Sequence, residues 1–367
     1  MEDTSSRRRR VRLAGYGVQL VFGVVRRCGD DGSGDRPAIQ PRVREHPAGN
    51  RESRWSGISL SEQQPVVRCS PPELESLSNL LDLSLYRNGL TGSIPAQLGS
   101  LASLENLWIN DNNLSGSIPP ELGSLSTLLE LALYDNGLTG SIPPELGNLA
   151  GLEILWLDGN DLSGSIPPEL GNLTSLDSLF LFNNQLSGGI PPKLGNLAGV
   201  RALYLNGNQL SGAIPPELGN RTTLQYLYLN GNQLTGSIPP ALGELFDLRR
   251  LLLHDNRLSG VIPAKLGSLS ALLYTYLNDN ALGGPVPVEL MDLTSLLDGR
   301  SNFSDNHLYT NDFGLSSFLD AKQIGGDWAG CQTVSVPTIL DAGIIVLCVL
   351  LTGSALWALG RSEITPG

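Results

Sequence analysis

Residues 101–124 read LASLENLWINDNNLSGSIPPELGS, and the pattern returns over residues 149–172 as LAGLEILWLDGNDLSGSIPPELGN. The shared unit is L-x-x-L-x-x-L-x-L-x-x-N-x-L-[ST]-G-x-I-P-x-x-L-G-x, and it recurs nine times over residues 77–292 at a constant period of 24 residues. One unit is too small to bury its own leucines, whereas stacked units share a continuous core. The repeat therefore predicts a solenoid, a curved stack held together by contacts between neighbours.

Each unit predicts a short strand followed by an irregular half. The segment Leu155-Trp156-Leu157 alternates core and solvent as a strand does. Later in the unit, Gly164 permits unusual backbone angles, and Pro167 fixes φ at a place where an α-helix would lose a hydrogen bond. We expect a repeat fold of the α/β class that is mainly β, with short parallel strands on a concave face and an extended or 3₁₀ convex side.

One asparagine recurs at the turn after every strand. Its carbonyl and its amide can both bond backbone groups that the turn leaves unpaired, and stacked copies would form a ladder. We predict a structural role, and no catalytic one, for Asn88, Asn112, Asn136, Asn160, Asn184, Asn208, Asn232, Asn256 and Asn280.

The motif L-x-x-L-x-L-x-x-N-x-L-[ST]-G-x-I-P resembles the plant-type class of leucine-rich repeats. That class is similar to the ectodomains of plant receptor-like kinases and receptor-like proteins, and to secreted polygalacturonase-inhibiting proteins, all of which bind ligands through the repeats. The resemblance implies molecular recognition as the function and leaves the ligand open. Residues 55–76 resemble the family's N-terminal cap, which usually closes with paired cysteines; here Ser59 stands near one expected cysteine and Cys69 is retained.

Three segments follow the array. Residues 293–333 begin a tenth repeat whose asparagine, Asn306, arrives two residues late, which is expected of a C-terminal cap. Residues 342–359 are an uncharged apolar run that, as a helix of about 27 Å, would nearly span a hydrocarbon core of about 30 Å. We expect a single transmembrane helix there, with a buried cap helix as the alternative. The tail, residues 360–367, is too short for a signalling domain, so a receptor of this design is expected to use a signalling co-receptor.

Residues 1–54 are expected to form a leader and a disordered linker. Arginines at 7–10 followed by a moderately apolar stretch give residues 7–25 the layout of a secretory signal, although no clear cleavage site follows. A secretory signal and a leader without function are both open. From residue 29 onward, glycine, proline, arginine and aspartate are typical of a linker.

Charge and motif content argue against several function classes. The net charge is −12, and the acidic excess lies after residue 54. An acidic surface repels phosphate backbones, so no nucleic-acid partner is expected. None of the three histidines stands in a nucleophile, acid–base or metal motif, and no G-x-x-x-x-G-K-[ST] occurs. We therefore expect no enzyme activity, no cofactor and no metal.

The residue between the two strand leucines faces solvent, and it is aromatic in most repeats. Rings bury a large area at little entropic cost and are enriched in binding sites. The predicted ligand-binding residues at this position are Trp108, Trp156, Phe180, Tyr204, Tyr228 and Tyr276. At the position two residues after this one, the predicted ligand-binding residues are Tyr134, Phe182, Asp158, Asn206 and Asn230. The alternative is that aromatics simply favour strands and were copied as the repeats duplicated.

Acidic side chains flank this face. Asp111 and Asp135 favour a ligand that carries positive charge. Four N-x-[ST] sequons could carry glycans if the repeats reach the secretory lumen, although asparagine-rich repeats also create sequons by chance. They lie at Asn113, Asn172, Asn220 and Asn302.

Taken together, these patterns favour a receptor-like protein anchored in the membrane, expected to be the plasma membrane, with extracellular repeats. The predicted ligand is a peptide, protein or glycan bound on the concave face. One alternative is a tail-anchored scaffold for protein interactions on the cytosolic face of an internal membrane. Another is a secreted inhibitor of an enzyme.

Overall fold

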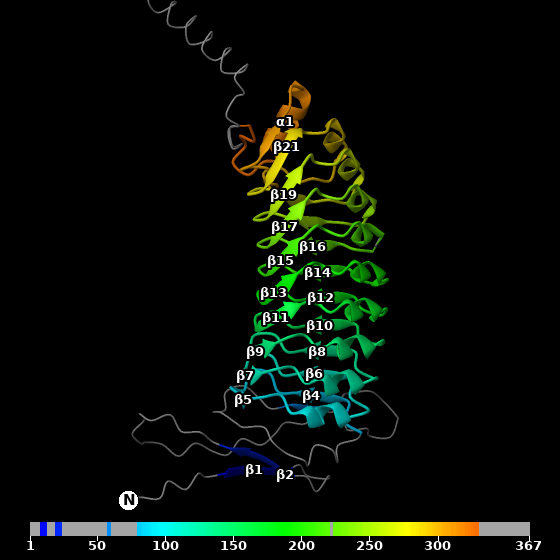
Figure 1. The fold of residues 1–367 in the computed structure, drawn as a ribbon, viewed down its shortest axis with the longest axis vertical. Coiled ribbons are helices and arrows are strands. Elements are labelled where there is room, and N and C mark those ends of the chain that lie inside the picture. Colours follow the sequence, from blue (N-terminus) through cyan, green and yellow to red (C-terminus); the bar gives the residue numbers. More distant parts are fainter. Residues whose placement is uncertain (1–7, 13–18, 24–56, 60–78, 221–222, 330–367) are drawn as a thin grey trace, which may run out of the picture.

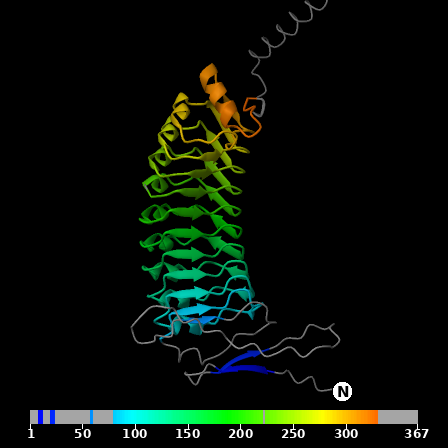
Figure 2. The same cartoon turned by 180° about the vertical axis from the view of Figure 1, so that it is seen from behind.

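Each repeat makes one turn of a coil, and the turns stack into an elongated column that ends at helix α1 (Figure 1). The computed structural model describes residues 8–12, 19–23, 57–59, 79–220 and 223–329. A solenoid with parallel strands and 3₁₀ turns was predicted from the repeat, and the structure confirms it. Figure 2 shows the column from behind, with successive strands crossing it in one direction.

The first sheet contains one strand from each repeat. Its strands are parallel and in register at the repeat length, so Leu155 pairs with Leu131 on one side and Leu179 on the other. The outer surface of this sheet is called the concave face below. Its members are β3 (Gly57–Ser59), β4 (Asp82–Ser84), β6 (Asn106–Trp108), β8 (Glu130–Ala132), β10 (Ile154–Trp156), β12 (Ser178–Phe180), β14 (Ala202–Tyr204), β16 (Tyr226–Tyr228), β18 (Arg250–Leu252) and β20 (Tyr274–Tyr276).

A second parallel sheet forms where only extended chain was expected. Stacking brings the same extended segment of adjacent turns side by side, and backbone groups placed there pair with one another. Gly164, for example, pairs with Leu186. The strands are β5 (Thr91–Gly92), β7 (Asn113–Gly116), β9 (Gly137–Gly140), β11 (Asp161–Ser165), β13 (Gln185–Gly188), β15 (Gln209–Gly212), β17 (Gln233–Gly236), β19 (Arg257–Gly260), β21 (Ala281–Pro285) and β22 (His307–Tyr309).

The rest of each turn is a short 3₁₀ helix that begins after a proline. Pro119 is extended, with φ −67° and ψ 130°, and Pro120 occupies the first helical position, where its missing N–H is not needed. The helices are η2 (Ala96–Ser100), η3 (Pro120–Ser124), η4 (Pro144–Asn148), η5 (Pro168–Asn172), η6 (Pro192–Asn196), η7 (Pro216–Asn220), η8 (Pro240–Glu244), η9 (Ala264–Ser268) and η10 (Val288–Asp292).

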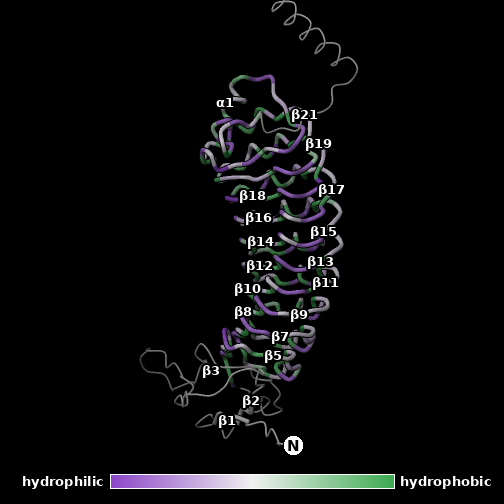
Figure 3. The backbone as a smooth tube through the Cα atoms, turned by 90° about the vertical axis from the view of Figure 1, so that its left-hand side faces the viewer, coloured by the Kyte–Doolittle hydropathy of each residue, from purple (hydrophilic) through white to green (hydrophobic). Residues whose placement is uncertain are grey.

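Leucine and isoleucine fill the inside of every turn. Leu155 and Leu157 are both 0% exposed, as is Leu170 of η5. These side chains join into one apolar cluster that extends from Leu80 to Trp328. In Figure 3, hydrophobic and hydrophilic segments recur turn after turn along the column, as the repeated sequence requires. Neighbouring turns thus stabilise each other, and no described repeat has a core of its own.

The recurring asparagine links consecutive turns. The Oδ1 atom of Asn136 accepts a hydrogen bond from the backbone N–H of Leu114 at 3.0 Å. Its Nδ2 donates to the carbonyls of Ile109, Leu133 and Tyr134. The same four bonds recur at Asn160, Asn184, Asn208, Asn232 and Asn256. Each of these asparagines therefore satisfies backbone groups of two turns, whereas the first, Asn88, donates to Tyr86 of its own turn and its Oδ1 has no partner among the described residues.

The described residues before the array form strands. β1 (Arg8–Arg12) and β2 (Gln19–Gly23) pair antiparallel, within the stretch 7–25 where a secretory signal is possible. β3 pairs with β4 and extends the first sheet by one strand before the first full repeat. The remainder of residues 1–54, and residues 60–76 of the expected N-terminal cap, lie outside the described residues.

The last described segment closes the core. β22 adds to the second sheet, and α1 (Phe313–Lys322) begins at Asp312, whose side chain accepts a hydrogen bond from the N–H of Leu315. Asn306 keeps its bond to the N–H of Leu282 despite the two extra residues. The expected transmembrane segment, 342–359, lies outside the described residues. Among those that are described, every helix is too short or too polar to cross a bilayer.

Candidate ligand-binding face

Three side chains of each repeat lie on the concave face. In β10 and the residues after it, Ile154, Trp156 and Asp158 alternate with Leu155 and Leu157, which are 0% exposed. Because successive side chains of a strand point to opposite sides, the first three share the outer face. We call these the first, middle and last positions of a repeat.

Rings at the middle position form a continuous row across four strands. The Trp156 and Phe180 rings are stacked, with centroids 6.1 Å apart and planes 7° apart. Phe180 meets Tyr204 edge to face at 4.8 Å, and Tyr204 stacks on Tyr228 at 4.1 Å. All four side chains are half-buried, because each ring covers part of the next. These four residues are called the aromatic row.

Two rings at the last position flank this row. Tyr134 meets Trp156 edge to face at 6.4 Å, and Phe182 meets Phe180 edge to face at 6.5 Å. Six of the predicted binding residues therefore form one contiguous apolar surface. Such contacts contribute about 0.5–1.5 kcal/mol per pair beyond the area that they bury.

The structure does not bring every predicted ring into this group. Ala132 occupies the middle position between Trp108 and Trp156, and the Trp108 Nε1–H donates instead to the Glu130 carboxylate at 2.9 Å. Tyr276 lies beyond Leu252, against His254 at 5.5 Å. Trp108 and Tyr276 thus belong to separate clusters on either side of the aromatic row.

A basic group that sequence reasoning missed lies beside one end of the aromatic row. The Arg250 guanidinium carbon is 5.4 Å from the Tyr226 ring centroid and 5.0 Å from that of Tyr274. Its Nη1–H donates to the Tyr228 hydroxyl at 3.2 Å. Arg250, Tyr226 and Tyr274 all occupy the first position. The sequence could have shown them, because the first position precedes the middle position by two residues in every repeat and therefore faces the same side of the sheet.

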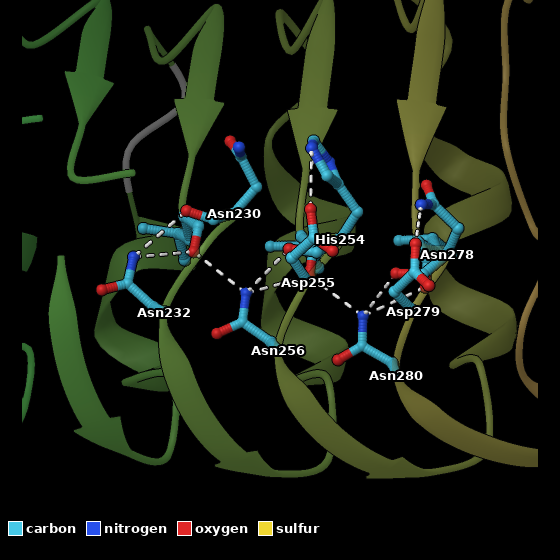
Figure 4. A network of polar contacts seen from close by, with 11 residues as sticks. Asn230, Asn232, His254, Asp255, Asn256, Asn278, Asp279 and Asn280 are labelled. Carbon is cyan, nitrogen blue, oxygen red and sulfur yellow. Dashed lines mark hydrogen bonds and ion pairs between the residues drawn. The ribbon is translucent and has the colours of Figure 1, made fainter. Parts of the chain in front are cut away.

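In the repeats toward the C-terminal end of the array, side chains at the last position have polar atoms without hydrogen-bond partners. The Oδ1 atoms of Asn206, Asn230 and Asn278 and the Nδ1 atom of His254 are inaccessible to solvent and form no hydrogen bond within the described residues. Figure 4 shows Asn230, His254 and Asn278 opposite the ladder asparagines, whose amides bond the chain. Buried polar atoms normally have partners. This row therefore offers hydrogen-bonding capacity that the fold leaves unused.

Electrostatics at the other end of the aromatic row are acidic. Asp158 is 7% exposed, and burial raises the pKa of its carboxyl group to about 7, with Asp135 adding to the shift. Burial and then Asp111 raise the pKa of Tyr134. Burial lowers the pKa of His254, which keeps the imidazole neutral near pH 7.

The predicted sequons differ in their surroundings. Asn113, Asn172 and Asn220 are exposed, on β7 and at the ends of η5 and η7. Asn302 is half-buried, and its Oδ1 accepts hydrogen bonds from the Ser304 N–H and the Gln323 Nε2–H. Access for a glycan is therefore better at the first three.

Comparison of the sequence with known families identifies the repeats. The family described as Leucine Rich Repeat matches residues 103–125, 127–149, 151–173, 175–197, 199–220, 223–245 and 247–269. No curated protein matches the chain at a significant level.

Several solved structures are similar to the chain. The Arabidopsis receptor kinase HAESA, in complex with the peptide hormone IDA and the co-receptor SERK1, is 35% identical with a TM-score of 0.65, over 69% of this chain and 42% of its own. The LRR ectodomain of the plant membrane receptor kinase GASSHO1/SCHENGEN3 from Arabidopsis thaliana, in complex with CASPARIAN STRIP INTEGRITY FACTOR 2, is 38% identical with a TM-score of 0.63, over 66% and 29%. PEPR1 with AtPEP1 is 32% identical with a TM-score of 0.61, over 70% and 39%. This chain spans less than half the length of each.

Proposed function

Because the chain belongs to the leucine-rich-repeat proteins and its repeats are of the plant type, we propose that it binds an extended peptide along the concave face. The observation that carries this proposal is the aromatic row, from Trp156 to Tyr228, with rings in mutual contact on one surface. A row of rings on successive strands is a ridge, and a ridge suits an extended ligand better than a compact one.

Polar groups beside the ridge support a peptide ligand. The unpaired Oδ1 atoms of Asn206 and Asn230 lie on the same face as Tyr204 and Tyr228. A peptide in extended conformation presents backbone N–H groups, which these half-buried amides can bond once their side chains turn toward the ligand. Side chains of the peptide would lie against the rings while its backbone meets the amides. A ligand held in this way satisfies atoms that the free protein leaves unpaired.

The proposal extends to a receptor-like protein with extracellular repeats, anchored through residues 342–359 and signalling through a co-receptor. Two observations support it. The apolar run has the length of a membrane span. The similar structure of HAESA contains both a peptide hormone and a co-receptor. The exposed sequons at Asn113, Asn172 and Asn220 are compatible with repeats that reach the secretory lumen.

The binding proposal is tested by replacing two rings of the aromatic row. Peptides are first selected on the whole protein from a display library of short random sequences. The double variant Trp156→Ala, Phe180→Ala is expected to bind the selected peptides more weakly by about 2 kcal/mol or more, because central aromatic residues carry much of the binding energy. Isothermal titration calorimetry measures the loss.

A matched control separates binding from folding. Phe246 is 47% exposed and follows η8, outside the concave face, so Phe246→Ala removes a surface ring without touching the row. Circular dichroism and a thermal melt verify that both variants remain folded. If the double variant is folded and binds every selected peptide as tightly as the original protein, the concave ridge is not the binding site.

A further inference from the structure

Asp158 is the one carboxylate at the last position among the nine repeats, where the others have tyrosine, phenylalanine, asparagine or histidine. Backbone hydrogen bonds fix its place in the stack. Its carbonyl accepts from the N–H of Asp135 at 3.0 Å, and the next residue, Gly159, donates to the carbonyl of Phe182 at 3.1 Å. Asp158 therefore lies between Tyr134 of the preceding repeat and Phe182 of the following one.

Within the part of the chain that the structure describes, no cationic side chain pairs with this buried carboxylate. The residue is 7% exposed, its Oδ1 atom is inaccessible to solvent, and that atom forms no hydrogen bond within the described residues. The donor that the fold offers the side chain is its own backbone N–H. The ionisable group that acts on it most is Asp135, which has the same sign of charge. An unpaired buried charge is unfavourable, so the fold alone does not account for a carboxylate here.

Three aromatic side chains lie around this carboxylate on the concave face. Trp156 precedes it on the same strand, and Tyr134, at the last position of the preceding repeat, contacts the Trp156 ring edge to face. Phe182 occupies the other side. Burial and Asp111 raise the pKa of the Tyr134 hydroxyl, Arg87 lowers it, and Asp135 and Asp158 raise it further. The faces of aromatic rings and carboxylates attract the same kind of group, a cation that has lost part of its water.

The rest of the last-position row does not combine these features. Asn206 and Asn230 also have unpaired oxygens, but an amide is neutral and serves any hydrogen-bond donor. Beside the far end of the aromatic row, Arg250 supplies a donor and a positive charge. Among the last positions of the nine repeats, Asp158 therefore combines a buried carboxylate with neighbouring rings.

We propose that Asp158, with Tyr134, Trp156 and Phe182 around it, is a subsite that receives an arginine or lysine side chain of the bound ligand. The inference rests on the proposed function, because it assigns one residue of the peptide to one place on the ridge. In the complex, the ligand cation pairs with the part of the Asp158 carboxylate that remains exposed, and its methylene stem packs against the rings.

Peptides selected on the whole protein from the random library provide the probe. The subsite predicts that peptides whose binding depends on Trp156 and Phe180 contain an arginine or lysine. Replacing that arginine by citrulline, or the lysine by its acetylated form, removes the charge and leaves the stem nearly unchanged. The loss on the original protein is expected to be about tenfold or more in Kd.

A double-mutant cycle assigns the cation to Asp158. On Asp158→Asn the charged peptide is expected to bind about tenfold more weakly, and neutralising the peptide as well should cause little further loss, because both changes remove the same interaction. Asp161→Asn is the control in the same repeat. Asp161 is exposed on β11, in the other sheet, and accepts from Gln185 Nε2, so its substitution should leave the affinity unchanged.

Each outcome supports or overturns a specific statement. Peptides that need Trp156 and Phe180 but contain no cation would overturn the subsite and leave the proposed function standing. The same holds if the penalties of Asp158→Asn and of the neutral peptide simply add. If no selected peptide depends on the two rings, the proposed function fails, and the subsite fails with it.

Discussion

At the scale of single residues, Asp158 shows how a side chain can be unfavourable in the free protein and useful in a complex. Its carboxyl group has a pKa raised to about 7 from an ordinary 3.8, chiefly by burial. A group whose pKa is raised on folding stabilises the fold fully below the unfolded value and loses that contribution as pH rises through the folded value. The relevant window is therefore pH 4 to about 7.

Because the pKa of Asp158 is raised on folding, we expect Asp158→Asn to stabilise the free protein at pH 8. The gain in free energy of unfolding should reach up to about 4 kcal/mol above pH 7 and shrink toward zero near pH 4. Urea unfolding of the original protein and of the variant, from pH 4 to pH 8, measures the difference in their free energies of unfolding. Titrating groups far from Asp158 contribute equally to both proteins and cancel in this difference. A variant that is less stable at pH 8 would mean that the carboxylate has a structural partner, and the subsite would lose its main argument.

Among single positions, the sequence predicted which side chains face outward but not which of them touch. The rings at the middle position follow directly from strand alternation. Their division into clusters depends on Ala132 and Leu252, whose small or aliphatic side chains interrupt the row. The first-position residues Arg250, Tyr226 and Tyr274 were missed because the aromatic pattern was followed at the two later positions only.

At the scale of elements, the glycine in each 3₁₀ helix sets how closely turns approach. A Cβ atom built on Gly171 of η5 would collide with the backbone carbonyl of Lys193 in η6, and the same overlap recurs from Gly99 to Gly267. Backbone atoms cannot move aside as a flexible side chain can. The equivalent position of η10 is Met291, which is 40% exposed, and no further 3₁₀ turn packs on it in the described part of the chain. The consensus glycine is thus replaced where the neighbouring turn ends.

Gly171→Ala is expected to lower the free energy of unfolding by about 2 kcal/mol or more, because one methyl group forces two turns apart. Gly151→Ala is the matched control in the preceding loop, where the new atom would meet neighbours at 3.8 Å or more and where Ala271 occupies the equivalent position. Midpoints of thermal unfolding compare the two variants. Equal midpoints would show that the spacing of the turns adjusts without strain.

The elements also show a limit of sequence reasoning. Strand, turn and 3₁₀ helix followed from leucine spacing and from prolines that exclude an α-helix. The second sheet did not, because most of its segments, such as Asp161–Ser165, lack the β-branched residues that mark strands. They pair because the stack places identical extended segments side by side. Tertiary stacking, and not local preference, makes them strands.

At the scale of the whole molecule, the array is an acidic ridge with different chemistry at its two ends. Asp135 and Asp158 lie toward the N-terminal end of the aromatic row, beyond which Arg87 pairs with Asp111, and Arg250 lies beside its C-terminal end. Further along, Asp255 and Asp279 act on His254. A peptide with one basic residue can therefore adopt a single direction along the face, because reversing it would place its cation against Arg250. The direction in which a peptide binds to this repetitive surface is thus set by the few residues that depart from the repeat.

The proposed anchor is tested on the full chain. Alkaline extraction should leave the original protein in the membrane fraction. Deleting residues 342–359 is expected to move the protein into the soluble fraction, because this run is the part of the sequence long and apolar enough to span a bilayer. Attachment through the arginines at 7–10 is controlled by repeating the extraction at high salt, which weakens contacts with anionic lipid.

The orientation of the repeats is read from the same preparations. Lumenal repeats should carry glycans at Asn113, Asn172 or Asn220, which are exposed, so glycosidase should increase the electrophoretic mobility of both the anchored and the truncated protein. Replacing these three asparagines by glutamine should abolish that change. An anchored protein that glycosidase never alters would instead favour repeats on the cytosolic side, where the concave face would serve as a scaffold. A truncated protein that still resists alkaline extraction would place the anchor elsewhere in the chain.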